Sequence, residues 1–589
     1  MSSNYVRAAS LADVQKTGCH VAQVDGRTLA LFQHQDQVYA VDNRCPHMGF
    51  PLDRGTVRDG ILVCHWHHAR FDLATGGTFD LFADDVPVFP TEMRGGEIWV
   101  DLSARRDPRA HHLKKLNDGL EQLIPLVIAK AVIALNDTDA NGRDAPPSFA
   151  AGLDFGARYR RAGWGQGLTM LTCFANLLPH LDAEDRPLAL YHGLSAVAAD
   201  TFDSPPRFPL DPLPGSAPDF ATLKRWFRQF VEVRDGEGAE RCIVTAVRAG
   251  AEGRQMTEML FAAATDHRYI QIGHVADFTN KALEALDLAG WSRAELVLAS
   301  LAAGYVNASR QEESNAWRSP IDLVELLEAA FEAMPAALEA GGAKRGRWAG
   351  REALTPILFA DDPGVICDTL LDSLRDGATE EELAGAVAHA AALRIARFHT
   401  SNEFTDWDTA LHTFTFANAV HQAVRRVSAS PSTGRDGRAE LLRGVFDAAM
   451  SVYLDRFLNI PAARLPEPDG NGAAPDALLA GFPALLDRQQ MVNEAAALVA
   501  RCFGAGGDPA RILAMLGKLL LREDRDFHTI QTVEAAFRQY DLLKGTREGT
   551  SVLIAAARYL AAHSPTVRAE GQTYRIAWRL HRGEKVFEE

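Results

Sequence analysis

"CPHMGFPLDRGTVRDGILVCHWHHARFD", residues 45–72, contains two cysteines that each precede a histidine at short spacing. Cys45 lies two residues before His47, and Cys64 lies three residues before His67. Each segment therefore offers one thiolate and one imidazole to a metal. A zinc site accepts such ligands, but zinc fingers usually pair cysteines in one loop and histidines in another. The mixed order favours a two-iron cluster in which one iron takes both cysteines and the other takes both histidines.

The two segments and their flanks resemble the ligand loops of the Rieske 2Fe–2S domain. "CPHMGFPLDRGTV" is similar to the first loop of that family and "CHWHHARFDLATGG" to the second, within a match of roughly residues 5–103. The resemblance implies a small β-sandwich that holds a 2Fe–2S cluster. It also implies that Cys45 and Cys64 bind one iron, while His47 and His67 bind the other.

The loops also differ from those of the high-potential Rieske proteins. Members from respiratory complexes carry an extra cysteine in each loop and a serine that donates a hydrogen bond to a cluster sulfide. Here Met48 and Gly49 stand at the place of the first extra cysteine, and the second loop has Trp66 and His68. Fewer hydroxyl donors leave the reduced cluster less stabilised. The resemblance therefore implies a potential toward the low end of the range of about −150 to +300 mV.

The residue composition and the hydrophobic periodicity of the chain change after about the first sixth of its length. Between residues 20 and 100, short β-branched or aromatic segments alternate with glycine-containing turns, which is typical of a small antiparallel β-domain. From about residue 110, Ala, Leu, Glu and Arg dominate with helical periodicity; only residues 240–249, "ERCIVTAVRA", look strand-like. We predict an α+β multidomain chain, with a Rieske β-sandwich at residues 1–105 and a large all-α, catalytic domain at residues 106–589.

The composition of the chain limits which kinds of partner it can bind and where in the cell it is expected. The net charge of −16 disfavours nucleic acid and anionic membranes as partners. The most apolar stretch, residues 123–135, contains Lys130 and is shorter than the roughly 20 residues that a membrane span needs. The first residues show no secretory signal, and the cysteines outside the two loops are isolated. We therefore expect a cytoplasmic protein.

The helical part carries its own histidines and carboxylates. Helices build non-haem iron sites from such residues, several helices giving one or two ligands each. His267 and His274 are seven residues apart, and His399 and Glu403 are four apart, spacings that place side chains on one helix face. The same pairs also suit ordinary surface salt bridges. The candidate catalytic residues are His192, His267, His274, His399, Glu403, Asp406, His412 and His528.

Two further comparisons of motifs bear on the helical part. Ring-hydroxylating oxygenases continue from a Rieske domain into a D-x-x-H-x4-H motif that holds mononuclear iron, and this sequence lacks it. The phrases "DHRYIQIGH", "FHTSNEF…HTFTFANAV" and "DRDFHTIQTVEAAF" are instead similar to the histidine-bearing helices of questin oxidase-like proteins. That resemblance implies a helical monooxygenase.

The sequence thus predicts an oxidoreductase, a Rieske-dependent oxygenase of non-standard architecture. An NAD(P)H-linked reductase partner donates electrons, because the chain has no dinucleotide fingerprint or P-loop of its own. The 2Fe–2S cluster relays single electrons to a centre in the helical domain, where O2 and a small organic substrate react; non-haem iron is the candidate metal of that centre. The alternative is an electron carrier or redox sensor whose helical domain is a non-catalytic docking scaffold.

Overall fold

The computed structural model describes residues 5–103, 108–138, 146–428, 435–469 and 474–586. The chain forms two compact units, which we call the first unit (Met1–Ala151 with Glu570–Glu589) and the second unit (Gly152–Ala569). The domain boundary predicted after residue 105 falls in the gap 104–107, outside the described residues, and stays a prediction.

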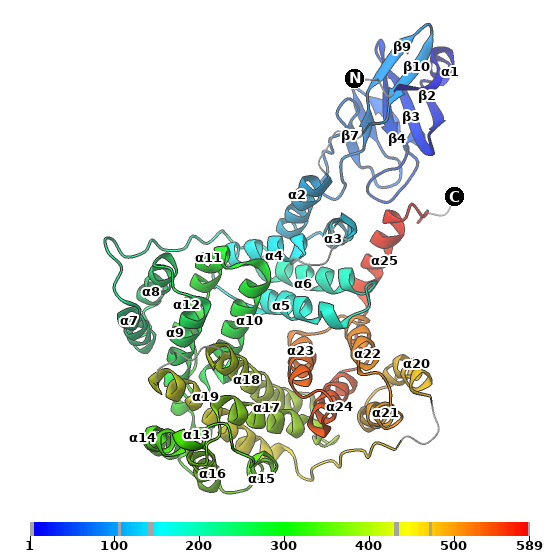
Figure 1. Ribbon diagram of the computed structural model, residues 1–589. Helices are drawn as coiled ribbons and strands as arrows, with labels where there is room; N and C mark the ends of the chain where they lie inside the picture. The colour runs from blue at the N-terminus through cyan, green and yellow to red at the C-terminus, as the bar shows by residue number, and fades with distance from the viewer. Residues whose placement is uncertain (1–4, 104–107, 139–145, 429–434, 470–473, 587–589) are drawn as a thin grey trace. The chain divides into compact units, whose positions relative to one another are not determined.

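The first unit begins with three small antiparallel sheets, drawn in blue in Figure 1. Their strand orders are β2-β3-β4-β8, β1-β10-β9 and β5-β6-β7. This β-rich part followed by helices confirms the predicted fold class. The strands are β1 (Tyr5–Ser10), β2 (Cys19–Val24), β3 (Arg27–His34), β4 (Gln37–Asp42), β5 (Thr56–Arg58), β6 (Ile61–Val63), β7 (Arg70–Asp72), β8 (Val88–Phe89), β9 (Thr91–Arg94) and β10 (Glu97–Asp101).

Strand β3 separates two hydrophobic cores. Leu29 and Leu31 point into one core, which also holds Ile98. Ala30 and Phe32 point into the other. This follows from the period of two along a strand, which sends successive side chains to opposite faces. The second core also contains the two cysteines of the motif, so the ligand loops rest on the packed interior of the sandwich.

Helices complete the first unit. They are α1 (Leu11–Thr17), α2 (Pro108–Glu121), α3 (Pro125–Thr138) and α25 (Ala569–His581), while α4 (Pro147–Arg158) crosses the boundary between the units. Helices α2 and α3 pack against each other. The apolar stretch around Lys130 forms α3, and no described helix is long and apolar enough to cross a membrane.

In the described residues of the second unit, the regular elements are helices joined by loops. Its helices before residue 320 are α5 (Gln166–Leu177), α6 (Arg186–Thr201), α7 (Phe220–Glu232), α8 (Gly236–Arg248), α9 (Gly253–Asp266), α10 (His274–Ala289), α11 (Ala294–Ala299), α12 (Ala302–Val306) and α13 (Asn315–Arg318). Those that follow are α14 (Leu323–Gly341), α15 (Arg351–Ile357), α16 (Pro363–Arg375), α17 (Glu380–Ala396), α18 (Phe404–Ser428), α19 (Arg435–Leu454), α20 (Pro475–Leu486), α21 (Val492–Gly504), α22 (Pro509–Leu521), α23 (Phe527–Leu542) and α24 (Arg547–Ala562).

The strand-like reading of residues 240–249 was wrong, because this segment lies in α8. Asp235 caps the helix by accepting a hydrogen bond from the Gly238 amide at 3.1 Å. Ile243 and Val244 are buried within the helix. Tertiary packing of these β-branched residues therefore outweighs their preference for strands.

Helix α18 lies at the centre of the second unit. It packs against α10 on one side and α23 on another, and α5 packs against both α10 and α23. Figure 1 shows these four helices, which come from distant parts of the sequence, gathered in one region. Each of α10, α18 and α23 carries one histidine of the site described below.

Candidate metal centres

Two tight loops present the cysteine–histidine motif. In the first loop, after β4, the Cys45 amide donates to the Phe50 carbonyl at 2.8 Å and the Gly49 amide donates to the Cys45 carbonyl at 2.8 Å. The second loop joins β6 to β7, and the Cys64 amide donates to the Ala69 carbonyl at 2.9 Å. Gly49 has φ near 80°, a conformation that favours glycine. Local hydrogen bonds therefore hold both loops closed.

The four predicted ligands gather at the tips of these loops. Cys45 and Cys64 are buried, with 3% and 1% of their surface exposed, whereas His67 is exposed. The rings of His47 and His67 have centroids 4.8 Å apart. The Nδ1 atom of His47 is buried and has no hydrogen-bond partner among the described residues. A buried nitrogen without a partner is costly unless it binds something, so this set fits a cluster held by two cysteines and two histidines.

Hydrogen bonding, burial and a nearby charge shift the pKa values of three of the predicted ligands. A hydrogen bond between the two thiols lowers the pKa of Cys64 to about 6 and raises that of Cys45. Burial, with the charge of Lys130 as a second cause, lowers the pKa of His47 to about 4. A neutral imidazole and a ready thiolate are the forms that bind metal.

Lys130 of α3 supports the first loop from outside the sheets. Its Nζ donates to the Pro46 carbonyl at 2.7 Å and also to the His47 carbonyl. Burial lowers the pKa of this lysine to about 8. Lys130 thus places a cation beside the cluster loop and fixes the backbone of a predicted ligand.

A second group of candidate ligands lies in the second unit. His274 is the first residue of α10, His412 lies in α18 and His528 lies in α23. One ligand nitrogen from each lies within 4.8 Å of the others. The ring centroids of His412 are 4.8 Å from those of both His274 and His528. The structure therefore brings together three of the eight residues predicted in the helical part.

We call His274, His412 and His528 the trio. The nitrogen atoms of these residues are in a state that suits metal binding. The Nε2 atoms of His412 and His528 are buried and have no hydrogen-bond partner among the described residues. Burial, reinforced by the neighbouring imidazoles, lowers the pKa of His412 to about 3, and that of His274 to about 4. The rings of His274 and His412 are held neutral, and the unpartnered nitrogens of His412 and His528 lie close together, which fits a cation with nitrogen ligands.

A carboxylate stands behind one of the three rings. Asp408 Oδ2 lies 3.9 Å from His528 Nδ1, and Asp408 Oδ1 accepts a hydrogen bond from the Tyr559 hydroxyl at 2.7 Å. A carboxylate on the far side of a ligating histidine orients the ring and raises its basicity. Asp408 lies one helical turn before His412, and its 3.9 Å contact with His528 is longer than a hydrogen bond.

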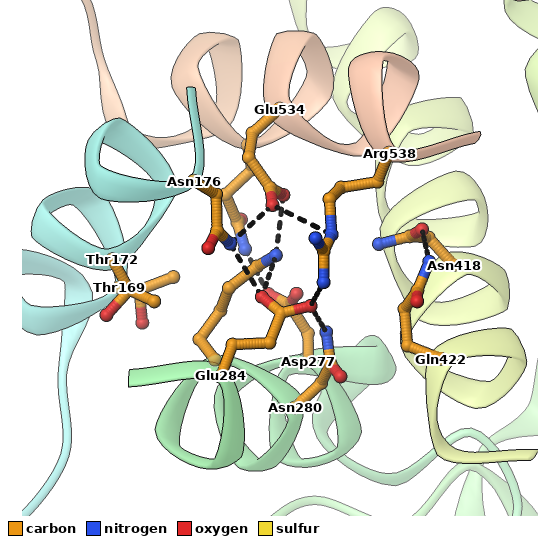
Figure 2. A network of polar contacts seen from close by, with 12 residues as sticks. Thr169, Thr172, Asn176, Asp277, Asn280, Glu284, Asn418, Gln422, Glu534 and Arg538 are labelled. Carbon is orange, nitrogen blue, oxygen red and sulfur yellow. Dashed lines mark hydrogen bonds and ion pairs between the residues drawn. The ribbon is translucent and has the colours of Figure 1, made fainter. Parts of the chain in front are cut away.

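A buried polar network continues from the trio along two helices. Asp277, Lys281 and Glu284 follow His274 on α10, and Glu534 follows His528 on α23. Figure 2 shows α5, α10, α18 and α23 around these side chains. On α10, Asp277, Lys281 and Glu284 lie three, seven and ten residues after His274 and share its helix face, whereas Glu534 lies six residues after His528 and does not share its face.

Ion pairs hold this network together. Lys281, with 1% of its side chain exposed, lies 2.9 Å from Glu284 and 2.5 Å from Glu534. The Asn176 amide donates to both carboxylates, at 2.8 and 2.7 Å, and Arg538 donates to Glu284 at 2.9 Å (Figure 2). Burial alone would raise the pKa of Glu284, but the charges of Lys281 and Arg538 outweigh it and lower that pKa. The network ties α5, α10 and α23 into one rigid support.

His267 does not join the trio. It follows α9, which ends at Asp266, and so does not share a helix with His274 as predicted. Its Nδ1 lies 2.8 Å from a carboxylate oxygen of Glu312, and its Nε2 lies 3.3 Å from Glu232. Tyr269, Gln271, Ile272 and Gly273, which all have positive φ, lie between the two histidines. The contacts of His267 are therefore with two carboxylates.

The other four predicted residues also lie elsewhere. His399 precedes α18 and shares a hydrogen bond with the Ser401 hydroxyl at 2.7 Å, so it does not pair along a helix with Glu403. Asp406 accepts a hydrogen bond from the Glu403 amide at 3.0 Å, which stabilises the start of the helix. His192 is buried, and its Nε2 lies 3.2 Å from the carbonyl oxygen of Leu521. These residues have local structural contacts.

The supporting residues have weak signals in the sequence. Lys130 is a single charge in an apolar stretch. Asp277 and Lys281 lie three and seven residues after His274, a spacing that shares a helix face, whereas Glu534, six residues after His528, has no such relation. The pairing between the two helices has no signal in a single sequence.

Comparison with known proteins concerns the first unit. The family model described as "Rieske [2Fe-2S] domain" matches residues 4–90. The ferredoxin component of the naphthalene 1,2-dioxygenase system of Pseudomonas aeruginosa is 26% identical over 104 residues, which are 18% of this chain and 100% of that protein. The ferredoxin subunit of 3-phenylpropionate/cinnamic acid dioxygenase of Escherichia coli (strain K12) is 32% identical over 102 residues, 17% of this chain and 94% of that protein.

A solved structure is similar over the same region. The ferredoxin of carbazole 1,9a-dioxygenase from Nocardioides aromaticivorans IC177 is 30% identical, with 17% of this chain and 100% of that one covered and a TM-score of 0.17. The family model and the two ferredoxin sequences support a 2Fe–2S cofactor and an electron-relay role for the Rieske domain. The similarity of the helical part to questin oxidase-like proteins stays a prediction. Through residues 4–90, the chain belongs to the Rieske [2Fe-2S] domain family.

Proposed function

We propose that this chain is an oxygenase in which the Rieske cluster supplies single electrons to a non-haem iron bound by His274, His412 and His528. The observation that carries the proposal is the convergence of three imidazoles, two of which have buried Nε2 atoms without a hydrogen-bond partner among the described residues. At the cluster, Cys45 and Cys64 hold one iron while His47 and His67 hold the other. The proposal keeps the NAD(P)H-linked reductase, O2, the small organic substrate and the cytoplasmic location predicted from the sequence.

The electron source requires a redox-active metal, for which we propose iron. Imidazole ligands suit zinc, copper, iron and nickel alike. Zinc has no redox chemistry and would make no use of electrons from a 2Fe–2S cluster. Three histidines also leave coordination positions open for small molecules, and iron in such a site activates O2 with electrons supplied one at a time. Iron therefore links the two centres into one activity.

The residues of this chain have distinct tasks in that activity. His274, His412 and His528 hold the metal, and Asp408 orients His528 from behind. The ion pairs of Lys281 keep α10 and α23 in register, so that His274 and His528 stay within reach of His412. Exposed His67 gives the cluster a contact with solvent and with a reductase, while the buried cysteines exclude water from the other iron.

Iron content tests the proposal with two matched variants. His412 is half-buried and His421 is buried, both in α18, but His421 bonds to Gln539 and does not belong to the trio. The wild type and His421→Ala should hold about three irons per chain, and His412→Ala about two, because a Rieske cluster holds two. All three should keep the Rieske EPR signal. Substrate-dependent oxygen uptake should be lost only in His412→Ala.

The same measurement distinguishes the oxygenase from the alternative function. A protein purified with sufficient iron that still holds about two irons per chain would contradict the proposal. An electron carrier or redox sensor with a helical docking scaffold would then remain. Zinc at the trio, seen by metal analysis, would contradict the oxygenase as well.

A further inference from the structure

A cavity of about 320 Å³ lies beside His274 in the second unit. It is formed by the segment that precedes α5, by the start of α10, and by residues 301–307 around α12. His274 is at once a wall of this cavity and a member of the trio. A molecule bound here would therefore lie against a proposed metal ligand. Neither the family match nor the relatives extend to this region.

The walls of the cavity are mostly apolar. Trp164, Leu301 and Val275 are buried wall residues, and Phe278 is half-buried. The indole nitrogen of Trp164 already donates to Thr169 Oγ1 at 2.8 Å, so its polar edge is satisfied. What the walls offer a ligand is aromatic and aliphatic surface, the usual lining of a small-molecule site.

The strong polar groups at the cavity are already paired. Arg160 lies 2.9 Å from Asp200, and it donates to the Gly163 carbonyl at 2.9 Å. The hydroxyl of Tyr305 donates to the Leu260 carbonyl at 3.0 Å. A charged ligand would lose its hydration without gaining a counter-ion, which is costly. The cavity therefore favours a neutral molecule.

Polar groups without such partners lie at the exposed rim. The Gln271 side chain accepts from the Ser309 amide through its oxygen, which leaves its NH2 group for a ligand. The Asn307 side chain donates to the Ala303 carbonyl through its nitrogen, which leaves its oxygen. Both residues are exposed and line the cavity. A ligand with one polar substituent would direct it to this rim and its ring toward His274.

The backbone at this rim is strained. Tyr269, Gln271 and Ile272 have φ values of 42°, 51° and 48°, and His274 follows directly after Gly273. Each non-glycine residue in this region costs about 1–3 kcal/mol, and such strain clusters at functional sites. Hydrogen bonds in both directions between Gln271 and Ser309, each 2.8 Å, hold the turn in place. The strained turn places His274 and the rim amide together.

We propose that this cavity is the substrate site of the three-histidine centre, and that it takes a neutral, planar, largely apolar molecule of one or two rings. The proposal rests on the proposed function of the trio. An apolar cavity of about 150 Å³ accommodates a benzene molecule in another protein, so about 320 Å³ suits a two-ring system. The ring lies between Trp164 and Phe278, and its reacting edge faces His274.

Gly304 provides a variant that fills the cavity. It lines the cavity within α12, and a Cβ atom added there meets no atom within 4 Å. Gly304→Phe should therefore fold and occupy the space of the ligand. Gly481→Phe is the matched control, because Gly481 is also an exposed helical glycine with open space at its Cβ, in α20. Ala162→Trp, at an exposed wall position, is a second cavity-narrowing variant.

The probes are indole, a neutral two-ring molecule, and its anionic analogue indole-3-carboxylate. Calorimetric titration of the full-length protein should show that indole binds the wild type and Gly481→Phe equally. Binding should be at least tenfold weaker in Gly304→Phe and in Ala162→Trp, and indole-3-carboxylate should bind the wild type at least tenfold more weakly than indole. Indole should also perturb the EPR spectrum of the helical iron, but not in Gly304→Phe.

The outcomes separate this proposal from the function on which it rests. If a third iron is present and indole binds both cavity variants as tightly as the wild type, the cavity is not the substrate site, while the proposed oxygenase function still stands. Equal binding of the anion overturns the substrate class. An iron content of about two per chain overturns the proposed function, and the role of the cavity falls with it. Circular dichroism and the Rieske EPR signal confirm that each variant is folded.

Discussion

The cluster loops and the histidine trio are built in opposite ways. The four predicted cluster ligands come from two neighbouring loops of one small sheet, closed by their own backbone hydrogen bonds. The trio comes from three helices that are far apart in the sequence, and a buried ion-pair network joins two of them. The difference shows that a local site depends on loop geometry, whereas a distributed site depends on the packing of the whole unit.

The largest expected effect separates the two sites by removing one. Cys64→Ala should abolish the Rieske EPR signal and the visible absorption of the cluster, because two thiolates are needed to hold one iron. The trio should keep its own metal, since its ligands lie in another unit. Cys19→Ala, at a free cysteine of the same unit, should leave the cluster intact. Loss of both metals in Cys64→Ala would show that the sites are not independent.

The second prediction probes the support of the distributed site. Lys281→Met leaves Glu284 and Glu534 buried without their shared cation. We expect the free energy of unfolding to fall by about 3–5 kcal/mol, the usual cost of breaking a buried ion pair. Urea unfolding followed by circular dichroism at 222 nm measures it. Lys518→Met, in an exposed pair with Glu184, should change stability by less than about 1 kcal/mol.

The third prediction asks whether the helical unit holds its histidines neutral. Burial lowers the pKa of His192 to about 4, whereas an unfolded histidine titrates near 6.5. Below pH 6.5 the unfolded chain therefore binds more protons, and the stability from this group falls as the pH drops toward 4. At pH 5 the loss is about 2 kcal/mol.

The difference in unfolding free energy between the wild type and His192→Gln isolates the contribution of this histidine. Buried Asp447 and Asp455 have pKa values raised to about 7 by burial, so their contribution to stability rises as the pH falls. His192→Gln removes only the histidine. Its unfolding free energy relative to the wild type should improve by about 2 kcal/mol between pH 7.5 and pH 5. A constant difference at the two pH values would refute the burial of a neutral imidazole at this position.

The smallest expected effect concerns Lys130, a charge that reaches the cluster loop from a helix. Lys130→Met removes a cation beside the first loop, and the reduced cluster carries one more negative charge. We expect the midpoint potential to fall by about 40 mV, which corresponds to about 1 kcal/mol for one electron. Lys114→Met, at an exposed position of α2, makes the same change of charge and should shift the potential far less. Equal shifts would mean that only the net charge matters.

Sequence reasoning succeeded where the signal was local. The strands around residues 28–35 and 37–42 form β3 and β4, because β-branched and aromatic residues between glycine turns favour a hairpin. It failed at residues 240–249, where the same residue types lie in a buried helix. His267 and His274 were expected on one helix, but a turn with positive φ at Gln271 and Ile272 separates them. No spacing rule detects such a turn.

By itself, the sequence determined the cluster domain. Cys45, His47, Cys64 and His67 are separated by short loops, so their spacing nearly defines their geometry, and the comparisons confirm the Rieske domain that they imply. The tertiary structure decided which helical histidines meet. His274, His412 and His528 converge because apolar faces and buried ion pairs pack α10, α18 and α23 together. Such packing depends on the summed burial of many side chains and not on the spacing of any few residues.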